Sequence, residues 1–240
     1  MRLDNPLLVR WEYASEERLE KRNAILRSLS QGPNPEDAAF AAVAAAKPTR
    51  ALDVGCGLGE LGDRFQRDLG TQVCAVDISP RMVELAKARG LDAQVADVEQ
   101  LPFEDRDFDC VFAGWVLYHV PNLERAIAEI ARVLKPDGTL VAAAVCTDNI
   151  DEVWRLIGVD EPREPLSFTR ENGAELLAPH FGDVVRQDVV GELVFPDSES
   201  LRTFVASTID RAHLAPSVPE ITEPFRATTR HVIFIGRRPR

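Results

Sequence analysis

The spacing of apolar residues predicts helices in the first 46 residues. Ser15 is placed to cap a helix that Gly32 and Pro33 end. Asn34 predicts a second N-cap, with Pro35 at the first helical position, and an alanine-rich run follows. The apolar stripe of the first helix consists of Leu19, Ile25, Leu26 and Leu29. We therefore expect residues 1–46 to form a helical segment.

From residue 50 onward, short apolar runs alternate with amphipathic segments. Ser79 and Asn122 are placed to begin two of these amphipathic helices, and Gly70 and Gly90 to end two. Strands are predicted at residues 50–55, 72–77, 92–97, 107–113 and 139–145. Near-continuous apolar strands between amphipathic helices are typical of a parallel sheet that helices cover on both faces.

After residue 146 the pattern is less regular. It predicts helices at 151–157, 170–177 and 198–214, and strands at 184–195 and 231–235. The chain shows no internal repeat and no low-complexity linker. We therefore expect one domain over residues 1–240, with a helical N-terminal segment (1–46), a core (47–146) and a third segment of helices and final strands (147–240).

The charge balance disfavours a nucleic-acid partner. Asp and Glu outnumber Lys and Arg by 39 to 28, and the net charge is −11. Such a surface repels a phosphate backbone unless a basic patch offsets it. The one basic cluster, at residues 236–240, is short, and we interpret it as a solvated tail rather than an RNA-binding arm.

The distribution of apolar residues and cysteines predicts a cytoplasmic protein. No run of 18 apolar residues exists, and the first residues do not resemble a signal peptide, so we expect no membrane contact. The cysteines form no Cys-x-x-Cys pair and lie within apolar runs, at positions 56, 74, 110 and 146. We interpret them as reduced core residues, and we expect neither a disulfide frame nor a metal site.

The segment from Asp53 to Glu60 carries the strongest chemical signal. It has the spacing Gly55-x-Gly57-x-Gly59 where a first strand turns into a first helix. Glycines there allow a ligand to approach the backbone closely. A dinucleotide fingerprint requires glycine where Glu60 stands, and a carboxylate would repel a pyrophosphate. The turn therefore favours a ligand that carries an ammonium group over a nicotinamide dinucleotide.

Two further acids follow the second and third predicted strands. Asp77 stands 22 residues after Gly55, where a carboxylate accepts hydrogen bonds from ribose hydroxyls. Asp97 ends the third predicted strand and is placed to accept a hydrogen bond from an adenine amino group. Alone, each acid is equally consistent with a helix cap or an ordinary turn. Behind this glycine turn, Asp77 indicates a nucleoside ligand.

Residues 53–140 resemble the class I S-adenosylmethionine-dependent methyltransferases, in the branch with the ubiquinone/menaquinone C-methyltransferases and many small-molecule O- and N-methyltransferases. The motifs that carry the resemblance are LDVGCGLGEL, VCAVDISPRMVELAKARG, ADVEQLPFEDRDFDCVFAGWVLYHV and EIARVLKPDGTLVAA. The resemblance implies a three-layer, Rossmann-like α/β fold. Its seven-stranded sheet is mostly parallel, with the last strand antiparallel, and the N-terminal helices form a lid.

The resemblance also implies a role for individual residues. The turn of Asp53, Gly55, Cys56 and Gly57 would hold the methionine moiety of S-adenosyl-L-methionine, and Asp77 would bind the ribose. The adenine and its surroundings would contact Ile78, Met82, Asp97 and the backbone of Val98, and the sulfonium would lie near Ala113 and Gly114. Tyr13 and Arg18 are candidates for the lid, with Arg18 as a partner for the methionine carboxylate.

His119 is the candidate catalytic residue. It follows the fourth predicted strand, where the methyl acceptor should approach, and an imidazole there can take a proton from a hydroxyl or an amine. A packing role is the alternative. Methyl transfer needs little acid–base help, because holding the nucleophile in line with the methyl carbon provides much of the acceleration.

Together these observations predict an enzyme that moves a methyl group by in-line displacement to an O, N or C nucleophile of a small molecule. The core would bind the cofactor, and residues 147–240 would build the acceptor side. The alternatives are a protein or RNA methyltransferase and a non-catalytic S-adenosylmethionine-binding protein. We expect a monomer or a homodimer.

Overall fold

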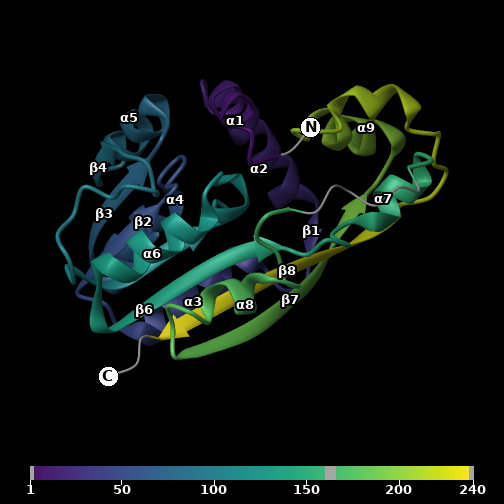
Figure 1. Ribbon diagram of the computed structural model, residues 1–240. Coiled ribbons are helices and arrows are strands. Elements are labelled where there is room, and N and C mark those ends of the chain that lie inside the picture. Colours follow the sequence, from purple (N-terminus) through teal and green to yellow (C-terminus); the bar gives the residue numbers. More distant parts are fainter. Residues whose placement is uncertain (1–2, 160–165, 238–240) are drawn as a thin grey trace.

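The computed structural model describes residues 3–159 and 166–237. One eight-stranded sheet, of order β1-β7-β8-β6-β5-β2-β3-β4, forms its centre, with helices on both sides (Figure 1). Its strands are β1 (Ser30–Gln31), β2 (Arg50–Val54), β3 (Gln72–Asp77), β4 (Asp92–Val95), β5 (Phe108–Gly114), β6 (Leu134–Val145), β7 (Asp183–Phe195) and β8 (Phe225–Arg237).

The strand pairing confirms the predicted fold class. Strands β2 to β6 pair in parallel, and the last strand, β8, runs antiparallel to both of its neighbours. All seven predicted strands are present. An eighth, the two-residue β1, pairs with β7 in the register Ser30↔Leu193. This strand was not predicted, because two polar residues carry no alternation that would indicate a strand.

The helices form two layers and an additional group at one end of the sheet. Those of the described residues are α1 (Pro6–Glu12), α2 (Glu17–Leu29), α3 (Pro35–Ala46), α4 (Glu60–Leu69), α5 (Pro80–Ala88), α6 (Leu123–Val133), α7 (Asp151–Leu156), α8 (Gly173–Leu177) and α9 (Ser198–Ala206), with 3₁₀ turns η1 (Leu117–His119) and η2 (Ala212–Ser217). One face of the sheet packs on α6 and α8, and the other packs on α3, α4 and α5. The predicted three-layer arrangement is thus confirmed.

Side-chain caps set several helix starts as predicted. The Asn34 side chain accepts from the Glu36 N–H at 2.7 Å, and Asn122 accepts from the Arg125 N–H at 3.1 Å. Ser79 caps α5, and Gly70, with φ +68°, ends α4. These caps determine where the helices at the carboxyl ends of β3 and β5 begin, and so they position the loops of the candidate site.

The N-terminal segment differs from the prediction. Its described residues contain three helices, where two were predicted. Ser15 does not cap α2, which begins after Glu16 without a side-chain cap. The first helix, α1, begins at Pro6, and the side chain of Asn5 accepts a hydrogen bond from the Leu7 N–H. Asn followed by Pro is a strong start signal, but one short turn shows too little apolar periodicity to be recognised as a helix.

The C-terminal part departs from the predicted boundaries in two helices. The helix predicted at 198–214 ends at Ala206, because the hydroxyls of Ser207 and Thr208 donate to the carbonyls of Phe204 and Val205. The helix predicted at 170–177 begins only at Gly173. The hairpin of β7 and β8 extends beyond the parallel strands and carries α7 and α9 on its own apolar core (Figure 1). We call this end of the molecule the distal lobe.

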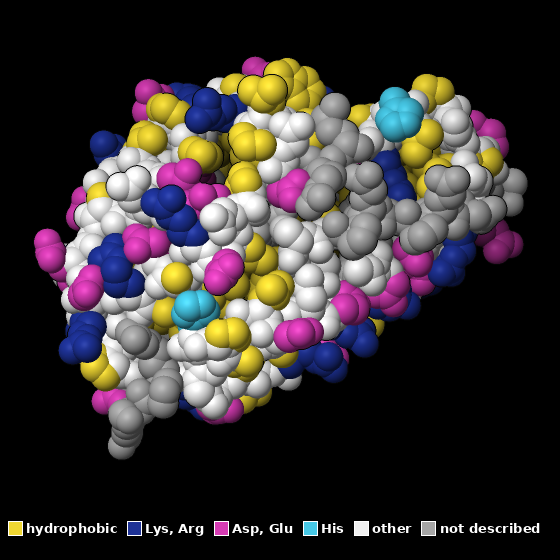
Figure 2. Space-filling view, viewed as in Figure 1, with side chains coloured by type: hydrophobic (Ala, Val, Ile, Leu, Met, Phe, Trp, Pro, Cys, Tyr) yellow, Lys and Arg dark blue, Asp and Glu magenta, His cyan; other side chains and the backbone are white. Residues whose placement is uncertain are grey.

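All four cysteines are free. Cys74, Cys110 and Cys146 are buried, as predicted, whereas Cys56 in the glycine turn is only partly buried. Among residues 3–159 and 166–237, no cluster of three His, Cys, Asp or Glu side chains is suited to a metal, and no helix is long and apolar enough to cross a membrane. The view in Figure 2 shows acidic and basic side chains interspersed over one face. Most of the predicted basic tail, residues 238–240, lies outside the described part of the chain.

Candidate functional site

The turn between β2 and α4 contains three glycines, and neighbouring side chains pack close to its backbone. Gly55, Gly57 and Gly59 have φ of +67°, +51° and +75°, a region that side chains strain. The N–H groups of Gly55 and Cys56 donate to the Val76 carbonyl at 2.8 and 3.0 Å, which ties the turn to the end of β3. The glycine turn therefore lies at the carboxyl edge of the sheet, where open α/β sheets bind ligands.

Asp77 connects the end of β3 to this turn. Its Oδ2 accepts a hydrogen bond from the Gly57 N–H at 3.0 Å, and its Oδ1 accepts one from the Ser79 N–H at 2.8 Å. Burial raises the pKa of this carboxyl, and these backbone hydrogen bonds counteract the rise. A carboxylate fixed in this way presents its remaining lone pairs at one position beside the glycine turn.

Asp53 lies underneath the turn. Its side chain is 3% exposed and reaches the start of α4, where the backbone of Gly62 forms a hydrogen bond with it. Burial, and then the charge of Asp77, raise the pKa of Asp53 to about 7. Asp53 therefore supports the turn from below and contributes a buried, titratable acid next to it.

The residues predicted around an adenine ring fall into two groups. Ile78, 39% exposed, and Asp97 keep solvent-exposed surface next to Asp77, and the Ala96 N–H donates to the Asp77 carbonyl at 3.1 Å. Val98 and Met82 are buried. Ile78 and Asp97 are thus placed for direct contact with a ligand, and only the backbone of Val98 is available for the role predicted for that residue.

The end of β5 lies on the other side of the glycine turn. Ala113 is fully buried, while Gly114 keeps some surface next to Phe112, whose ring would lie within 2.4 Å of a Cβ at Gly114. Cys56, in the turn, is partly buried, and burial raises the pKa of its thiol. The residues predicted near the sulfonium carry no charged side chain themselves, and the carboxyls of Asp53 and Asp77 lie close enough to act on Cys56.

Helices α1 and α2 lie over this edge of the sheet, and we call them the cover. The Ser79 hydroxyl donates to the Tyr13 carbonyl at 2.7 Å, and Arg81 donates two hydrogen bonds to Glu16, at 2.9 and 2.6 Å. The Arg81 contacts lower the pKa of Glu16 to about 2. Leu19 lies 3.6 Å from where a Cβ of Gly57 would be. A lid of α1 and α2 is thus present and contacts the glycine turn. It is shorter than the predicted 1–46, because α3 packs on a face of the sheet.

Glu60, the residue that argued against a dinucleotide, also binds the cover. Its carboxylate pairs with Arg27 of α2 and lies 3.6 Å from Arg89. This acid at the start of α4 is therefore neutralised from two sides, and its role is to anchor the cover.

An ion cluster inside the cover was missed from the sequence. Glu12 is 2% exposed and pairs with Arg22 at 2.8 Å and Arg18 at 3.2 Å. Arg22 also donates to the Ser207 carbonyl of the distal lobe at 3.3 Å. Arg18 stacks on Trp11, at 4.1 Å from the ring centroid, so the side chain predicted to meet the methionine carboxylate faces α1 instead. No periodic signal distinguishes Arg22 from its neighbours in α2.

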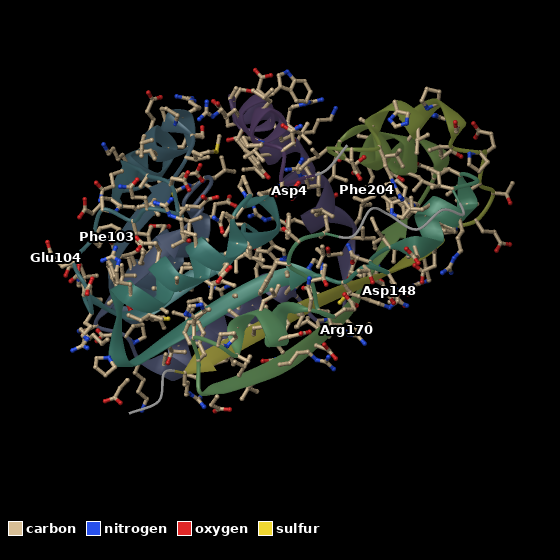
Figure 3. All side chains as sticks on the ribbon, viewed as in Figure 1. Asp4, Phe103, Glu104, Asp148, Arg170 and Phe204 are labelled. Carbon is tan, nitrogen blue, oxygen red and sulfur yellow. The ribbon has the colours of Figure 1, made fainter. Side chains whose placement is uncertain are left out.

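His119 lies beneath the cover rather than open to an acceptor. Its side chain is 9% exposed, with Nε2 at 3.1 Å from the Tyr13 hydroxyl and Nδ1 at 2.9 Å from the Leu3 carbonyl. Burial, together with the charge of Arg22, lowers the pKa of His119 to about 4. Both ring nitrogens are bonded to the N-terminal segment. In Figure 3, the labels of Asp4, from this segment, and of Phe204, from α9, lie on the same side of the long strands.

Comparisons with known proteins agree with this geometry. Residues 52–142 match the methyltransferase domain family. The chain is 33% identical, over 140 residues, to a malonyl-[acyl-carrier protein] O-methyltransferase of Enterobacter lignolyticus, covering 56% of this chain and 55% of that protein. It is 39% identical, over 102 residues, to a ubiquinone/menaquinone biosynthesis C-methyltransferase of Pseudomonas putida, covering 38% and 40%. The chain thus spans about half the length of these relatives, or less.

A solved structure extends the likeness to most of the fold. The YcgJ protein of Bacillus subtilis superposes with a TM-score of 0.61 at 19% identity, over 85% of this chain and 99% of that one. The strand order and the glycine turn define the class I fold of S-adenosylmethionine-dependent methyltransferases. Residues 52–142 form a methyltransferase domain of this class, and its cofactor is S-adenosylmethionine, as the motifs predict.

Proposed function

We propose that the protein transfers a methyl group from S-adenosylmethionine to a small-molecule acceptor. The observation that carries the proposal is the hydrogen bond from the Gly57 N–H to Asp77 under a cover formed by α1 and α2. The hydrogen bond places the exposed backbone of the glycine turn next to the fixed carboxylate of Asp77. The cover lies over both of them. These are the features that a nucleoside with an amino-acid tail requires.

The residues fit a cationic ligand. Asp53 and Asp77 lie next to the glycine turn, and the charge of Asp77 helps to raise the pKa of Asp53. A positively charged ligand would relieve this repulsion. When bound, S-adenosylmethionine supplies an electrophilic methyl group on a positively charged sulfur. In this proposal Asp77 binds the ribose, Ile78 packs on the adenine, Asp97 accepts from its amino group, and the glycine turn holds the methionine part.

The chain's own contribution to the reaction would be enclosure and alignment. The cover excludes water, and the end of β5 provides an uncharged lining where the acceptor and the methyl group would meet. Because both nitrogens of His119 are bonded to the N-terminal segment that carries the cover, at Tyr13 and Leu3, we assign His119 to holding the cover closed. Alignment of an acceptor that is already nucleophilic requires no base.

A two-stage experiment tests the proposal. Calorimetry with S-adenosylmethionine and S-adenosylhomocysteine comes first, and Asp92→Asn, at the amino end of β4, serves as a control for Asp77→Asn. A screen of small acceptors with mass detection of a methyl gain follows. If the protein binds neither S-adenosylmethionine nor S-adenosylhomocysteine, the proposal is overturned. Binding with methyl gain only on a protein or an RNA would replace the small-molecule acceptor with a macromolecule.

A further inference from the structure

Trp115, the residue after β5, has an unusual backbone. Its φ is +54°, a region that bulky residues rarely adopt and that tends to occur at functional sites. The Trp115 N–H donates to the Ala143 carbonyl of β6 at 2.8 Å, which holds the strained turn in place. The turn sends successive side chains to opposite faces of the sheet. Val116 packs against Gly55 of the glycine turn, and Trp115 packs with the core on the α3 side.

The indole of Trp115 is bonded to His231 of β8. Its Nε1–H donates to Nδ1 of His231 at 3.1 Å, and the rings meet edge to face with centroids 6.0 Å apart. An indole nitrogen can only donate, so Nδ1 of His231 is the acceptor. Burial lowers the pKa of His231 to about 4, so the ring is neutral near pH 7. A neutral imidazole whose Nδ1 accepts carries its proton on Nε2, and His231 is therefore a fixed hydrogen-bond donor.

The pair lies beside the site described above. His231 pairs across the sheet with Val145, the last residue of β6, and Trp115 directly follows Gly114, the last residue of β5. These are the carboxyl ends of two adjacent strands. As whole residues, Trp115 and His231 are both partly buried rather than fully buried.

We propose that Trp115 and His231 form a recognition site for a planar aromatic acceptor that carries an oxygen, such as a phenol or an aromatic carboxylate. The indole contacts the ring of the acceptor, and the Nε2–H of His231 donates to its oxygen. His231 is not a base in this arrangement, because Nε2 has no free lone pair. The inference rests on the proposed function. It does not change the residues that the proposed function assigns to the cofactor.

Indole N–H signals in a ¹H–¹⁵N NMR spectrum provide the test. The chain has 3 tryptophans, so Trp115→Phe identifies the Trp115 signal by its loss. The protein, saturated with S-adenosylhomocysteine, is titrated with phenol, with benzoate and with cyclohexanol as the non-aromatic control. We expect phenol and benzoate to shift the Trp115 signal with saturation, and cyclohexanol to leave it unchanged. The signals of Trp11 and Trp154 should not move.

Variants of His231 then isolate its hydrogen bond. His231→Gln keeps an N–H donor and should keep affinity for benzoate, whereas His231→Phe should lose about fivefold to tenfold. Trp154→Phe, in the distal lobe, is the matched control and should bind as the wild type does. Equal affinity in His231→Phe, equal binding of cyclohexanol, or an unmoved Trp115 signal would each overturn the inference. If the wild-type protein does not bind S-adenosylhomocysteine at all, the proposed function is overturned instead.

Discussion

The hydroxyl of Tyr13 lies 3.1 Å from Nε2 of His119, and this contact joins the cover to the loop after β5. The Leu3 carbonyl, at 2.9 Å from Nδ1, can only accept, so Nδ1 carries the proton. Nε2 of the neutral ring must then accept from the Tyr13 hydroxyl. Burial raises the pKa of Tyr13 to about 12, so the phenol keeps its proton and remains a donor near pH 7.

Removing this hydroxyl should speed release of the bound nucleoside. Tyr13→Phe leaves a buried imidazole nitrogen without a donor, at a cost of about 1 kcal/mol in the closed state, which corresponds to roughly a fivefold faster dissociation. Stopped-flow measurement of S-adenosylhomocysteine release checks this. Leu7→Ala, on the exposed side of α1, is the control and should release at the wild-type rate.

The same pair of residues separates the two roles of His119. If His119 only holds the cover, His119→Phe and Tyr13→Phe should affect release similarly and leave single-turnover methyl transfer within a few fold. A base would give a different pattern, in which the His119 variant alone loses roughly 10²–10⁴ in the chemical step. That second pattern would refute the assignment to the cover.

Asp77→Asn should weaken S-adenosylmethionine binding without unfolding the protein. The variant keeps the side-chain shape but loses charge-assisted hydrogen bonds to the ribose, worth about 2–4 kcal/mol in total. Its amide nitrogen also cannot accept, so one of the two bonds from the Gly57 and Ser79 N–H groups is lost. Titration calorimetry measures the change, and thermal unfolding confirms the fold. Asp92→Asn removes an exposed aspartate at the other end of a neighbouring strand and should bind normally. An unchanged dissociation constant for Asp77→Asn would reject the ribose assignment.

Gly57→Val should reduce cofactor binding more than Asp97→Ala does. At a φ of +51° any side chain is strained, and the Cβ of a valine there would lie in van der Waals contact with Leu19 of the cover, 3.6 Å from its Cδ2. Asp97 supplies a single contact at the edge of the site, and its Oδ1 already accepts from the Glu99 N–H. The ratio of the two dissociation constants is the test, and equal losses would mean that the glycine turn does not contact the ligand.

Local rules determine part of the candidate site. Glycines at a strand-to-helix turn and an acid at the end of the next strand lie at the same edge once the sheet is parallel, and Gly57 and Asp77 are hydrogen-bonded there. Contacts between residues far apart in the sequence could not be predicted in the same way. Ser79 meets Tyr13, and Trp115 meets His231, over separations of 66 and 116 residues, and each pairing depends on tertiary packing.

The burial of Asp53 should make stability depend on pH. The pKa of Asp53 is about 7 in the folded protein, against 3.8 as the ordinary value. Between these two values the folded state holds a proton that the unfolded state releases. The resulting contribution to stability is complete below about pH 4 and is lost as the pH rises through about 7.

Asp53→Asn removes this titration and keeps a side chain of the same size that can accept from the Gly62 backbone. Relative to the wild type, the variant should therefore gain free energy of unfolding as the pH rises, by up to about 1.4 kcal/mol per pH unit, and level off above about pH 7. Urea unfolding of both proteins from about pH 5 to about pH 8 measures the difference. A constant difference between the wild type and Asp53→Asn across this range would show that Asp53 titrates as an ordinary carboxyl and is already charged beneath the glycine turn.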